Sequence, residues 1–328
     1  MKTVLQICLL LALVLADDLA LENSFNGFMK QFRRQYSDEA EKNYRFLQFK
    51  ENMKIIEEHN SRQNAYVLGI TPFTDLSNEE FASRFVLNTA IMEKAKSIST
   101  PTEFPTLPSM DLQGIPHGVD WVQQNKVTSV KNQKSCGSCW AFSAVGAIES
   151  AVAIQGGKLE DLSVQYLVDC DYGDSGCQGG LMSNAYEFVM EDGLPLWEDY
   201  PYIARQGSCR KVPPKVSILG YYDVPTGSSY ELMKALTKNP VSVAIQADSA
   251  VFQNYKSGVL SDESCGHNLN HGVLTVGYEL DTSHPYFRVK NSWGPSWGED
   301  GYIRLAITDS YYGTCGIHLL PSYPFVDL

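Results

Sequence analysis

Hydrophobic positions repeat with a helical period in the first part of the chain. Residues 20–85 are rich in charge, and four apolar side chains near their start are spaced i, i+3, i+4, i+7, as on one face of a helix. These four are Phe25, Phe28, Met29 and Phe32. A longer helical pattern covers residues 37–60, where Ser37 or Asp38 can cap the first turn. The pattern therefore predicts two amphipathic helices in this region.

The pattern loosens between residues 88 and 114. Prolines punctuate this stretch and its end, among Ser and Thr residues, at Pro101, Pro105, Pro108 and Pro116. Such a segment is typical of an exposed linker, where proteolysis concentrates.

Beyond the linker, a helix is expected from Cys139 to Gly156-Gly157, with Ser138 as its cap. It is apolar on nearly every side, so we expect it to be central and buried. Shorter helical patterns follow at 163–169, 183–191 and 230–238, and strand patterns at 241–245, 271–278, 286–291 and 301–306. A helical first half and a β-rich second half predict an α+β fold with two subdomains and a cleft between them.

Composition supports a globular protein and excludes one class of partner. The chain has 328 residues, of which 44% are hydrophobic and 20% charged, enough for about two folded units. Its net charge is −12, and no run of Lys or Arg could form a basic face. We therefore expect no nucleic-acid partner.

The N-terminus predicts the secretory pathway. Lys2 precedes an apolar run from Val4 to Leu15, and Ala16 ends it, as in a signal peptide covering residues 1–16. The alternative, a membrane anchor, needs about 20 apolar residues. Removal of this segment takes Cys8 with it and leaves seven cysteines: Cys136, Cys139, Cys170, Cys177, Cys209, Cys265 and Cys315. An odd number leaves one thiol for an intermolecular link or for reactivity.

The pair Cys136-Gly-Ser-Cys139 permits three interpretations. A zinc site needs a second close pair of ligands, and a thioredoxin-like motif needs a βαβ setting; the sequence offers neither. The third interpretation is a nucleophile, Cys139, in the first turn of a helix, where the helix dipole favours a thiolate. A nucleophile of this kind needs a general base and a group that orients the base. His271, at the start of an apolar strand, and Asn291 supply that pair of residue types.

With these residues the sequence resembles a papain-like cysteine peptidase. Cys139 lies in a Cys-Gly-Ser-Cys-Trp motif of this family, and Asn291 begins an Asn-Ser-Trp motif. His271 and Asn291 lie 132 and 152 residues after Cys139. The resemblance implies Cys139 as nucleophile, His271 as its base and later acid, and Asn291 as the group that orients the ring. It also implies that Trp293 shields the His–Asn hydrogen bond and that Gln133 stabilises the oxyanion.

The resemblance extends to the whole architecture. It implies a helical left subdomain, a β-barrel-like right subdomain and a cleft, over residues 115–328, preceded by an α-helical prodomain over residues 17–114. It also implies three disulfides, with Cys139 left free and no metal or cofactor. The implied bridges are Cys136–Cys177, Cys170–Cys209 and Cys265–Cys315.

The upstream helices resemble the inhibitory propeptide of the cathepsin L-like branch. The family pattern falls on one helix face at Glu41, Arg45, Phe49, Asn52, Ile56 and Asn60. Gly69-x-Thr71-x-Phe73-x-Asp75 matches the companion motif, except that Thr71 stands where the family usually has Asn. The protein is thus expected to be a zymogen rather than to carry an amphipathic helix without inhibitory function. We expect cations, with Arg45 as one candidate, to lower the pKa of Asp75, so that acid releases the propeptide.

Substrate selection is also implied by the resemblance. Gly179 and Gly180 are expected to pair with the substrate backbone, and an apolar S2 pocket is expected from Leu181, Met182, Ala244, Leu269, Gly272 and Leu320. Such a pocket favours Leu or Val over Phe, and both over Arg, at the residue two places before the cut. Lys134 replaces a usual Gly beside Gln133, and we expect it to point to solvent. No inserted His-containing loop is present, which favours an endopeptidase.

The expected setting and partners follow. We expect a monomer without a membrane span, in a lysosome-like acidic vesicle or outside the cell, acting on proteins and peptides. Its own propeptide and cystatin-like proteins are the expected inhibitors. A catalytically dead relative acting as a binding protein, and an inhibitor built from the propeptide alone, are the rival hypotheses. The complete set Cys139, His271, Asn291 and Gln133 favours the enzyme.

Overall fold

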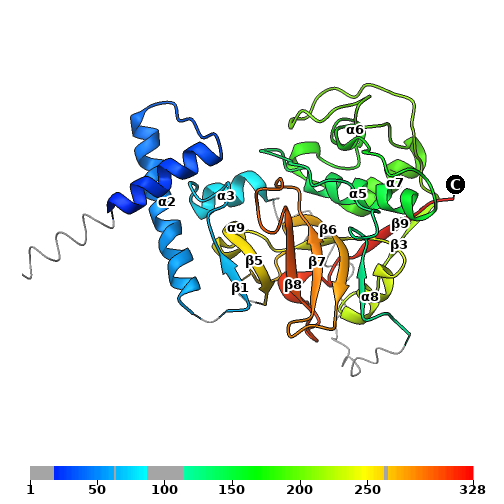
Figure 1. Ribbon diagram of the computed structural model, residues 1–328. Coiled ribbons are helices and arrows are strands. Elements are labelled where there is room, and N and C mark those ends of the chain that lie inside the picture. Colours follow the sequence, from blue (N-terminus) through cyan, green and yellow to red (C-terminus); the bar gives the residue numbers. More distant parts are fainter. Residues whose placement is uncertain (1–17, 63, 87–113, 262–264, 328) are drawn as a thin grey trace, which may run out of the picture.

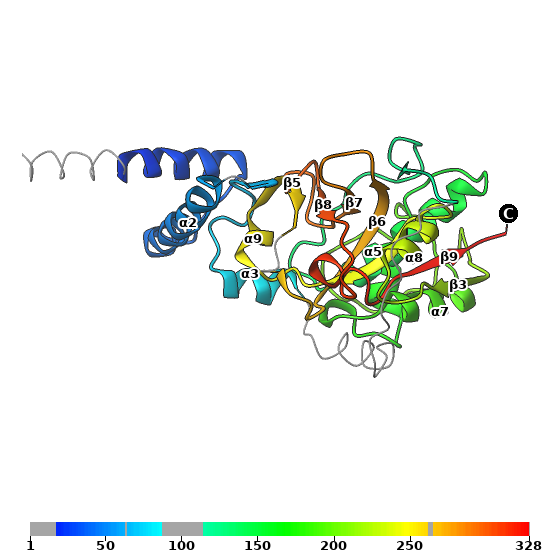
Figure 2. The same cartoon turned by 90° about the horizontal axis from the view of Figure 1, so that it is seen from below.

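The N-terminal part of the chain forms a separate helical unit. The structure is a computed structural model of the full chain and describes residues 18–62, 64–86, 114–261 and 265–327. Residues 18–31 are helical and cross α2 (Glu39–Asn60), as Figures 1 and 2 show. Both expected helices are thus confirmed, whereas the expected signal peptide and most of the expected linker lie outside the described residues.

Aromatic packing holds this crossed pair together. Phe25 and Phe28 of the first helix contact Phe49 of α2 with ring centroids 5.3 Å apart. The Asp38 side chain accepts a hydrogen bond of 2.8 Å from the Glu41 N–H, which makes Asp38 the N-cap of α2. The chain continues through β1 (Tyr66–Leu68) and α3 (Asn78–Phe85) to the end of this unit.

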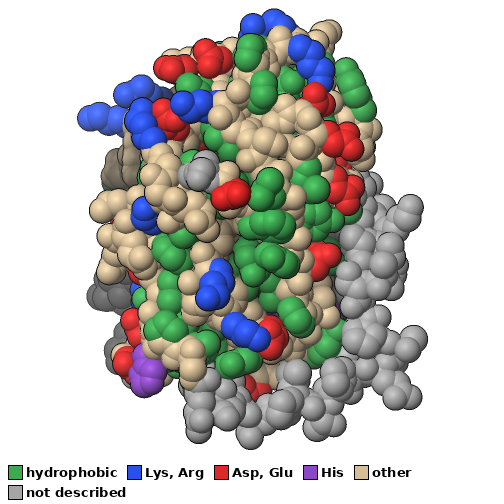
Figure 3. Space-filling model, turned by 90° about the vertical axis from the view of Figure 1, so that its right-hand side faces the viewer, with side chains coloured by type: hydrophobic (Ala, Val, Ile, Leu, Met, Phe, Trp, Pro, Cys, Tyr) green, Lys and Arg blue, Asp and Glu red, His purple; other side chains and the backbone are tan. Residues whose placement is uncertain are grey.

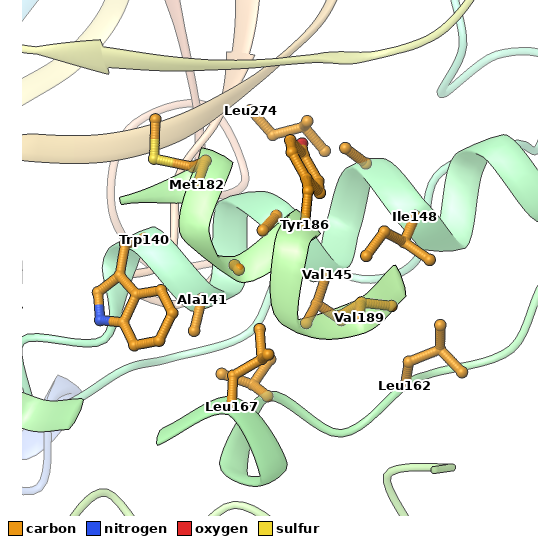
Figure 4. Close-up of a cluster of buried hydrophobic side chains, with 14 of the residues drawn as sticks. Trp140, Ala141, Val145, Ile148, Leu162, Leu167, Met182, Tyr186, Val189 and Leu274 are labelled. Atoms are coloured by element: carbon orange, nitrogen blue, oxygen red, sulfur yellow. The ribbon is translucent and has the colours of Figure 1, made fainter. Parts of the chain in front are cut away.

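A helical subdomain surrounds the long apolar helix α5 (Cys139–Ile154). It includes α6 (Val164–Cys170), η1 (Gly176–Gln178) and α7 (Met182–Asp192). Figure 4 shows why α5 is apolar on nearly every side: Leu167 of α6 approaches it from one side, and Met182 of α7 and Leu274 of the sheet from another. Ser138 is the N-cap residue of α5, as expected, but its side chain forms no capping hydrogen bond, because its hydroxyl lies 2.6 Å from that of Tyr202.

The sheet forms the second subdomain. Its strand order is β1-β5-β8-β7-β6-β4-β9-β3, with β2 also paired to β6, and β5–β8 is a parallel pair among antiparallel ones. The strands beyond β1 are β2 (Gly118–Asp120), β3 (Gly220–Asp223), β4 (Val241–Ile245), β5 (Tyr255–Leu260), β6 (His271–Glu279), β7 (Tyr286–Lys290), β8 (Tyr302–Ala306) and β9 (Ser322–Phe325). Helices α8 (Ser229–Leu236), α9 (Ala250–Gln253) and η3 (Thr314–Gly316) complete it. The four strands expected from sequence are present, and the α+β class is confirmed.

The two subdomains meet where α5 crosses β6. Gly146 favours this close approach, because a Cβ atom at this position would lie 2.9 Å from the Leu274 side chain of β6. Beside this contact, the buried Thr128 hydroxyl donates to Glu149 at 2.6 Å and accepts from Lys290 at 3.1 Å. The close approach brings the first residues of α5 and β6 together.

The N-terminal helical unit packs against the outer edge of the sheet. β1 is antiparallel to β5 and extends the sheet by one strand, and α3 lies near α9 (Figures 1 and 2). On the opposite side of the molecule, basic side chains are scattered among acidic ones around a hydrophobic strip (Figure 3). Within the described residues, no helix is long and apolar enough to cross a membrane.

Candidate active site

Three separate elements place a thiol, an imidazole and an amide together. Cys139 is the first residue of α5, His271 is the first residue of β6, and Asn291 follows β7 directly. The Cys139 Sγ accepts a hydrogen bond of 3.3 Å from the N–H of Gly272, next to His271. His271 Nε2 lies 2.8 Å from Asn291 Oδ1, while its buried Nδ1 has no hydrogen-bond partner. The ring is therefore held at one nitrogen and has the other available for proton transfer.

Trp293 covers the imidazole. Its ring is stacked on that of His271 with centroids 4.6 Å apart, and Trp297 meets it edge-on at 5.1 Å. These aromatic rings shield the His271–Asn291 pair from water, and the low dielectric of the surroundings strengthens its hydrogen bond.

Gln133 is held beside this group by a serine that the sequence analysis did not single out. The Ser292 hydroxyl donates to Gln133 Oε1 at 2.6 Å, and Gln133 Nε2 donates to the Cys136 carbonyl at 3.1 Å. Tyr202 contributes a further bond, from its hydroxyl to the Gln133 carbonyl, at 2.8 Å. Because Ser292 fixes Oε1, the amide N–H₂ faces the Cys136–Cys139 turn, and one of its two hydrogens is uncommitted.

Burial opposes ionisation of the Cys–His pair in the precursor. Desolvation raises the pKa of the Cys139 thiol to about 12, against smaller opposing effects of three backbone N–H groups. It also lowers the pKa of His271 to about 4. The N–H groups at the start of α5 lower the pKa of the thiol, as expected, but burial of Cys139 outweighs them in this state.

The residues expected to line the S2 pocket belong to one apolar cluster. Met182, Ala244 and Leu269 are buried, and Leu181 and Leu320 pack against the same cluster. Gly272 lies opposite Ala244 in the β4–β6 pairing, and a Cβ atom at Gly272 would lie 3.2 Å from the Met182 sulfur. The structure thus brings all six residues to the boundary between the two subdomains.

The two glycines before Leu181 are conformationally constrained. Gly179 has φ = 122°, in the region that favours glycine. A Cβ atom at Gly180 would lie 2.6 Å from both Asp174 Cγ and the Trp140 ring. A larger residue at either position would therefore displace this segment.

The N-terminal helical unit reaches the site through aromatic side chains. Phe73 and Phe81 contact Trp293 edge-on, with centroids 5.5 and 5.2 Å apart. The hydroxyl of Thr71 donates to the Gln253 carbonyl at 2.9 Å, and Gln253 Nε2 donates to the Phe73 carbonyl at 2.9 Å. Thr71, the departure from the family motif, is thus part of the contact between the two units.

The expectation that nearby cations lower the pKa of Asp75 is wrong. Asp75 pairs with Arg34 at 3.2 Å and accepts from the Tyr36 hydroxyl at 3.0 Å, while Arg45 reaches only its backbone carbonyl. Burial raises the pKa of Asp75 despite these partners. A raised folded-state pKa means that ionised Asp75 costs stability as pH rises, so acid does not release the propeptide through this residue.

The pKa of Glu80 is shifted in the opposite direction, downward. Glu80 lies 2.8 Å from Arg45 and forms a capping box with Ser77 at the start of α3. Burial acts to raise its pKa, but the Ser77 N–H and Arg45 outweigh burial and lower it. The stabilisation it provides is therefore present above its unfolded pKa and is lost as pH falls through the lower folded value.

The three disulfides in the structure are those that the resemblance implies. They join Cys136 to Cys177, Cys170 to Cys209 and Cys265 to Cys315, and Cys139 is a free cysteine within the described part of the chain. No group of acidic, His or Cys side chains suited to a metal ion occurs among the described residues.

This fold and this grouping of thiol, imidazole and amide define a latent cysteine peptidase. The family model "papain family cysteine protease" matches residues 115–325, and that of the "cathepsin propeptide inhibitor domain" matches residues 25–81. The chain belongs to the papain family, in its cathepsin L-like branch, as a cysteine-type endopeptidase with a propeptide.

Known relatives are similar over nearly the whole chain. Cysteine protease XCP2 of Arabidopsis thaliana is 43% identical over 92% of this chain and 85% of its own. Chymopapain of Carica papaya is 39% identical over 92% of this chain and 86% of its own. The solved structure of a recombinant stem bromelain precursor has a TM-score of 0.84 at 40% identity and covers 94% of this chain and 100% of its own. The proform of the ragweed allergen Amb a 11 has a TM-score of 0.85 at 35% identity and covers 94% of this chain and 95% of its own.

Lys134, beside Gln133, has a left-handed backbone conformation, and its substitution tests the cost of that conformation. It is exposed, has φ = 53°, and its N–H donates to Asn132 Oδ1 at 2.8 Å. Lys134→Gly keeps that bond and removes a left-handed backbone cost of about 1 kcal/mol. We expect the unfolding midpoint of the precursor to rise by about 2–4 °C. Lys134→Ala, which removes the charge but not the strain, is the control and should show no such rise in calorimetry.

Proposed function

We propose that the mature enzyme cleaves peptide bonds through a Cys139 acyl-enzyme. The observation that carries this proposal is the His271 ring, bound to Asn291 at Nε2 and unpartnered at Nδ1, beside the free Cys139 thiol. The imidazole takes the thiol proton, and the sulfur attacks the carbonyl carbon of the substrate. His271 then protonates the leaving amine. In the second half of the reaction, His271 takes a proton from water, the water attacks the acyl carbon, and the Cys139 sulfur leaves.

Gln133 stabilises the negative charge on the carbonyl oxygen. Its Nε2 retains one hydrogen beyond that donated to Cys136, and Ser292 keeps the amide in this orientation. Removal of the propeptide opens the site and hydrates the Cys–His pair. Because burial is the main cause of the unfavourable pKa values, hydration favours the thiolate–imidazolium form.

We further propose the division of the chain and its destination. Residues 1–16 are a signal peptide, 17–114 an inhibitory propeptide with a linker, and 115–328 the peptidase domain. The precursor enters the secretory pathway, and an acidic compartment or the extracellular space is its destination. Three disulfides and a propeptide support this proposal.

The apolar cluster at the subdomain boundary is proposed to select the residue two places before the cut. Leu181, Met182, Ala244, Leu269, Gly272 and Leu320 bring no charge to it. Leu or Val is therefore preferred over Phe, and Arg is poorly accepted.

Catalytic substitutions test the nucleophile and the oxyanion group. Cys139→Ala and His271→Ala should each abolish peptide hydrolysis, since the two residues act as a unit. Gln133→Ala should lower kcat by about 10²–10³-fold. A thiol-directed epoxide should label one cysteine per activated molecule, at position 139, in the wild type and in Gln133→Ala. Hydrolysis by Cys139→Ala at the wild-type rate would refute the assignment.

A peptide library tests the pocket. Leu or Val should exceed Phe at the second residue before the cut, by a modest margin, since one methylene is worth about 1–3 kcal/mol. Leu320→Ala should raise the Phe-to-Leu ratio of kcat/KM, because it opens volume in the pocket. Equal cleavage of peptides with Arg and with Leu two places before the cut, in the wild type, would contradict the proposed specificity.

The acid response of the propeptide can be assigned to Glu80. Glu80→Gln keeps the capping box but removes the charge that Arg45 binds, so the propeptide should loosen at a higher pH than in the parent. Processing of the precursor is followed by gel electrophoresis from neutral pH to about pH 4, close to the unfolded pKa of a carboxyl group.

Glu51→Gln is the matched control, because Glu51 pairs only with Lys54 on the exposed face of α2 among the described residues. Its processing should follow the parent. An unchanged pH dependence in Glu80→Gln would exclude this ion pair from the trigger.

A further inference from the structure

Two acidic side chains lie behind the Gly179–Leu181 segment. Asp171 is the C-cap of α6, and Asp174 follows in the loop that leads to η1. Neither residue belongs to the catalytic group, and neither forms a salt bridge within the described part of the chain.

Asp174 holds the segment directly. Its Oδ1 accepts from the backbone N–H of Leu181 at 3.0 Å and from the side-chain amide of Asn184, in the first turn of α7, also at 3.0 Å. A Cβ atom at Gly180 would lie 2.6 Å from the Asp174 carboxyl carbon, so the carboxyl group packs tightly against the segment. The place of Asp174 thus determines the place of Gly180 and Leu181.

The Oδ2 atoms of Asp171 and Asp174 lack a hydrogen-bond donor, so the pair needs a proton of its own. Asp171 Oδ1 accepts from the Gly173 N–H at 2.9 Å, but the Oδ2 atoms of Asp171 and Asp174 are both buried without a donor from elsewhere in the protein. Burial raises both pKa values, and the charge of Asp171 raises that of Asp174 further, so Asp174 is the member that takes the proton. One shared proton therefore removes the repulsion and the cost of two unpaired buried oxygens.

The surroundings favour retention of this proton. The surface hollow beside Asp171 is lined by the carboxylates of Glu187, Glu191 and Asp192 and by one cation, Lys211. Lys211 is paired with Asp192 at 2.6 Å, and Glu187 accepts from the Tyr221 hydroxyl. On the other side, Asp174 accepts from the neutral Asn184 amide, and the neutral Trp140 ring lies beside Gly180.

Burial decides whether the carboxyl pair stabilises the fold at acidic or at neutral pH. Burial, and then the charge of Asp171, raise the pKa of Asp174 to about 7, and burial raises the pKa of Asp171 as well. The stabilisation of the folded pair is therefore present at acidic pH and is lost as pH rises through about 7. Above that value two charged carboxylates face each other directly behind the segment.

We propose that Asp171 and Asp174 form a singly protonated carboxyl pair that positions the Gly179–Leu181 segment for the substrate backbone, and that loss of its proton weakens substrate binding. The inference rests on the proposed function of that segment. Asp174 is a positioning residue, since it acts through the backbone of Leu181. Acidic pH then favours substrate binding in the cleft as well as release of the propeptide.

The decisive measurement is KM and kcat between pH 5 and pH 8, on enzyme activated from the full-length precursor, with a peptide that carries Leu two places before the cut. The wild-type KM should rise several-fold across this range. Asp174→Asn keeps the Oδ1 acceptor and donates permanently to Asp171, so its KM should stay near the acidic value at every pH. Its kcat profile should match that of the wild type, because Cys139 and His271 are unchanged.

Three further variants complete the design. Asp171→Asn removes the same repulsion from the other side and should flatten the KM profile likewise. Asp174→Ala removes the acceptor for Leu181 and should raise KM at every pH, a loss that Asp174→Asn does not show. Asp192→Asn is the control, because Asp192 lies on the rim of the hollow and bonds to Lys211; its profile should follow the wild type.

The two proposals fail in different ways. If the epoxide labels Cys139 and the wild type hydrolyses peptides, but Asp174→Asn and Asp171→Asn keep the wild-type rise in KM, the carboxyl pair has no part in binding. If the wild type shows no hydrolysis and no labelling, the proposed catalytic function fails first.

Discussion

The packing around Trp293 joins the Cys–His–Asn group to the propeptide. One face of its ring lies against His271, and its surroundings include Phe252 and Trp297 of the sheet subdomain. Phe73 and Phe81 of the propeptide meet the same ring edge-on. The residue that covers the His271 ring is therefore also the residue that the propeptide contacts.

Desolvation, more than any individual charge, sets the protonation of the buried groups. It raises the pKa of Cys139, lowers that of His271 and outweighs the cation beside Asp75. Glu80 differs because it is less deeply buried and combines a backbone N–H with Arg45. Carboxyl groups a few residues apart in one propeptide therefore respond to acid in opposite directions, as burial and hydrogen bonding decide.

Much of the architecture could be predicted from the sequence. Helical periodicity located α2, and the apolar run after Cys139 located α5, because both elements follow local rules of spacing. The strand β5 was missed, since Gly258 and polar residues interrupt its pattern and its neighbours β1 and β8 are distant in sequence. The place of Ser138 at the N-cap of α5 was predicted, but not the loss of its side-chain capping bond, because Tyr202, far along the chain, binds its hydroxyl.

The sequence by itself determined the family, the candidate residues Cys139, His271 and Asn291, and the odd thiol, because these depend on residue type and spacing alone. Only the tertiary structure decided the partners of Asp75 and Glu80, the support of Gln133 by Ser292 and the meeting of Asp171 with Asp174. The physical reason is that a pKa and a side-chain orientation depend on burial and on neighbours from other elements. Spacing along one chain does not specify either of them.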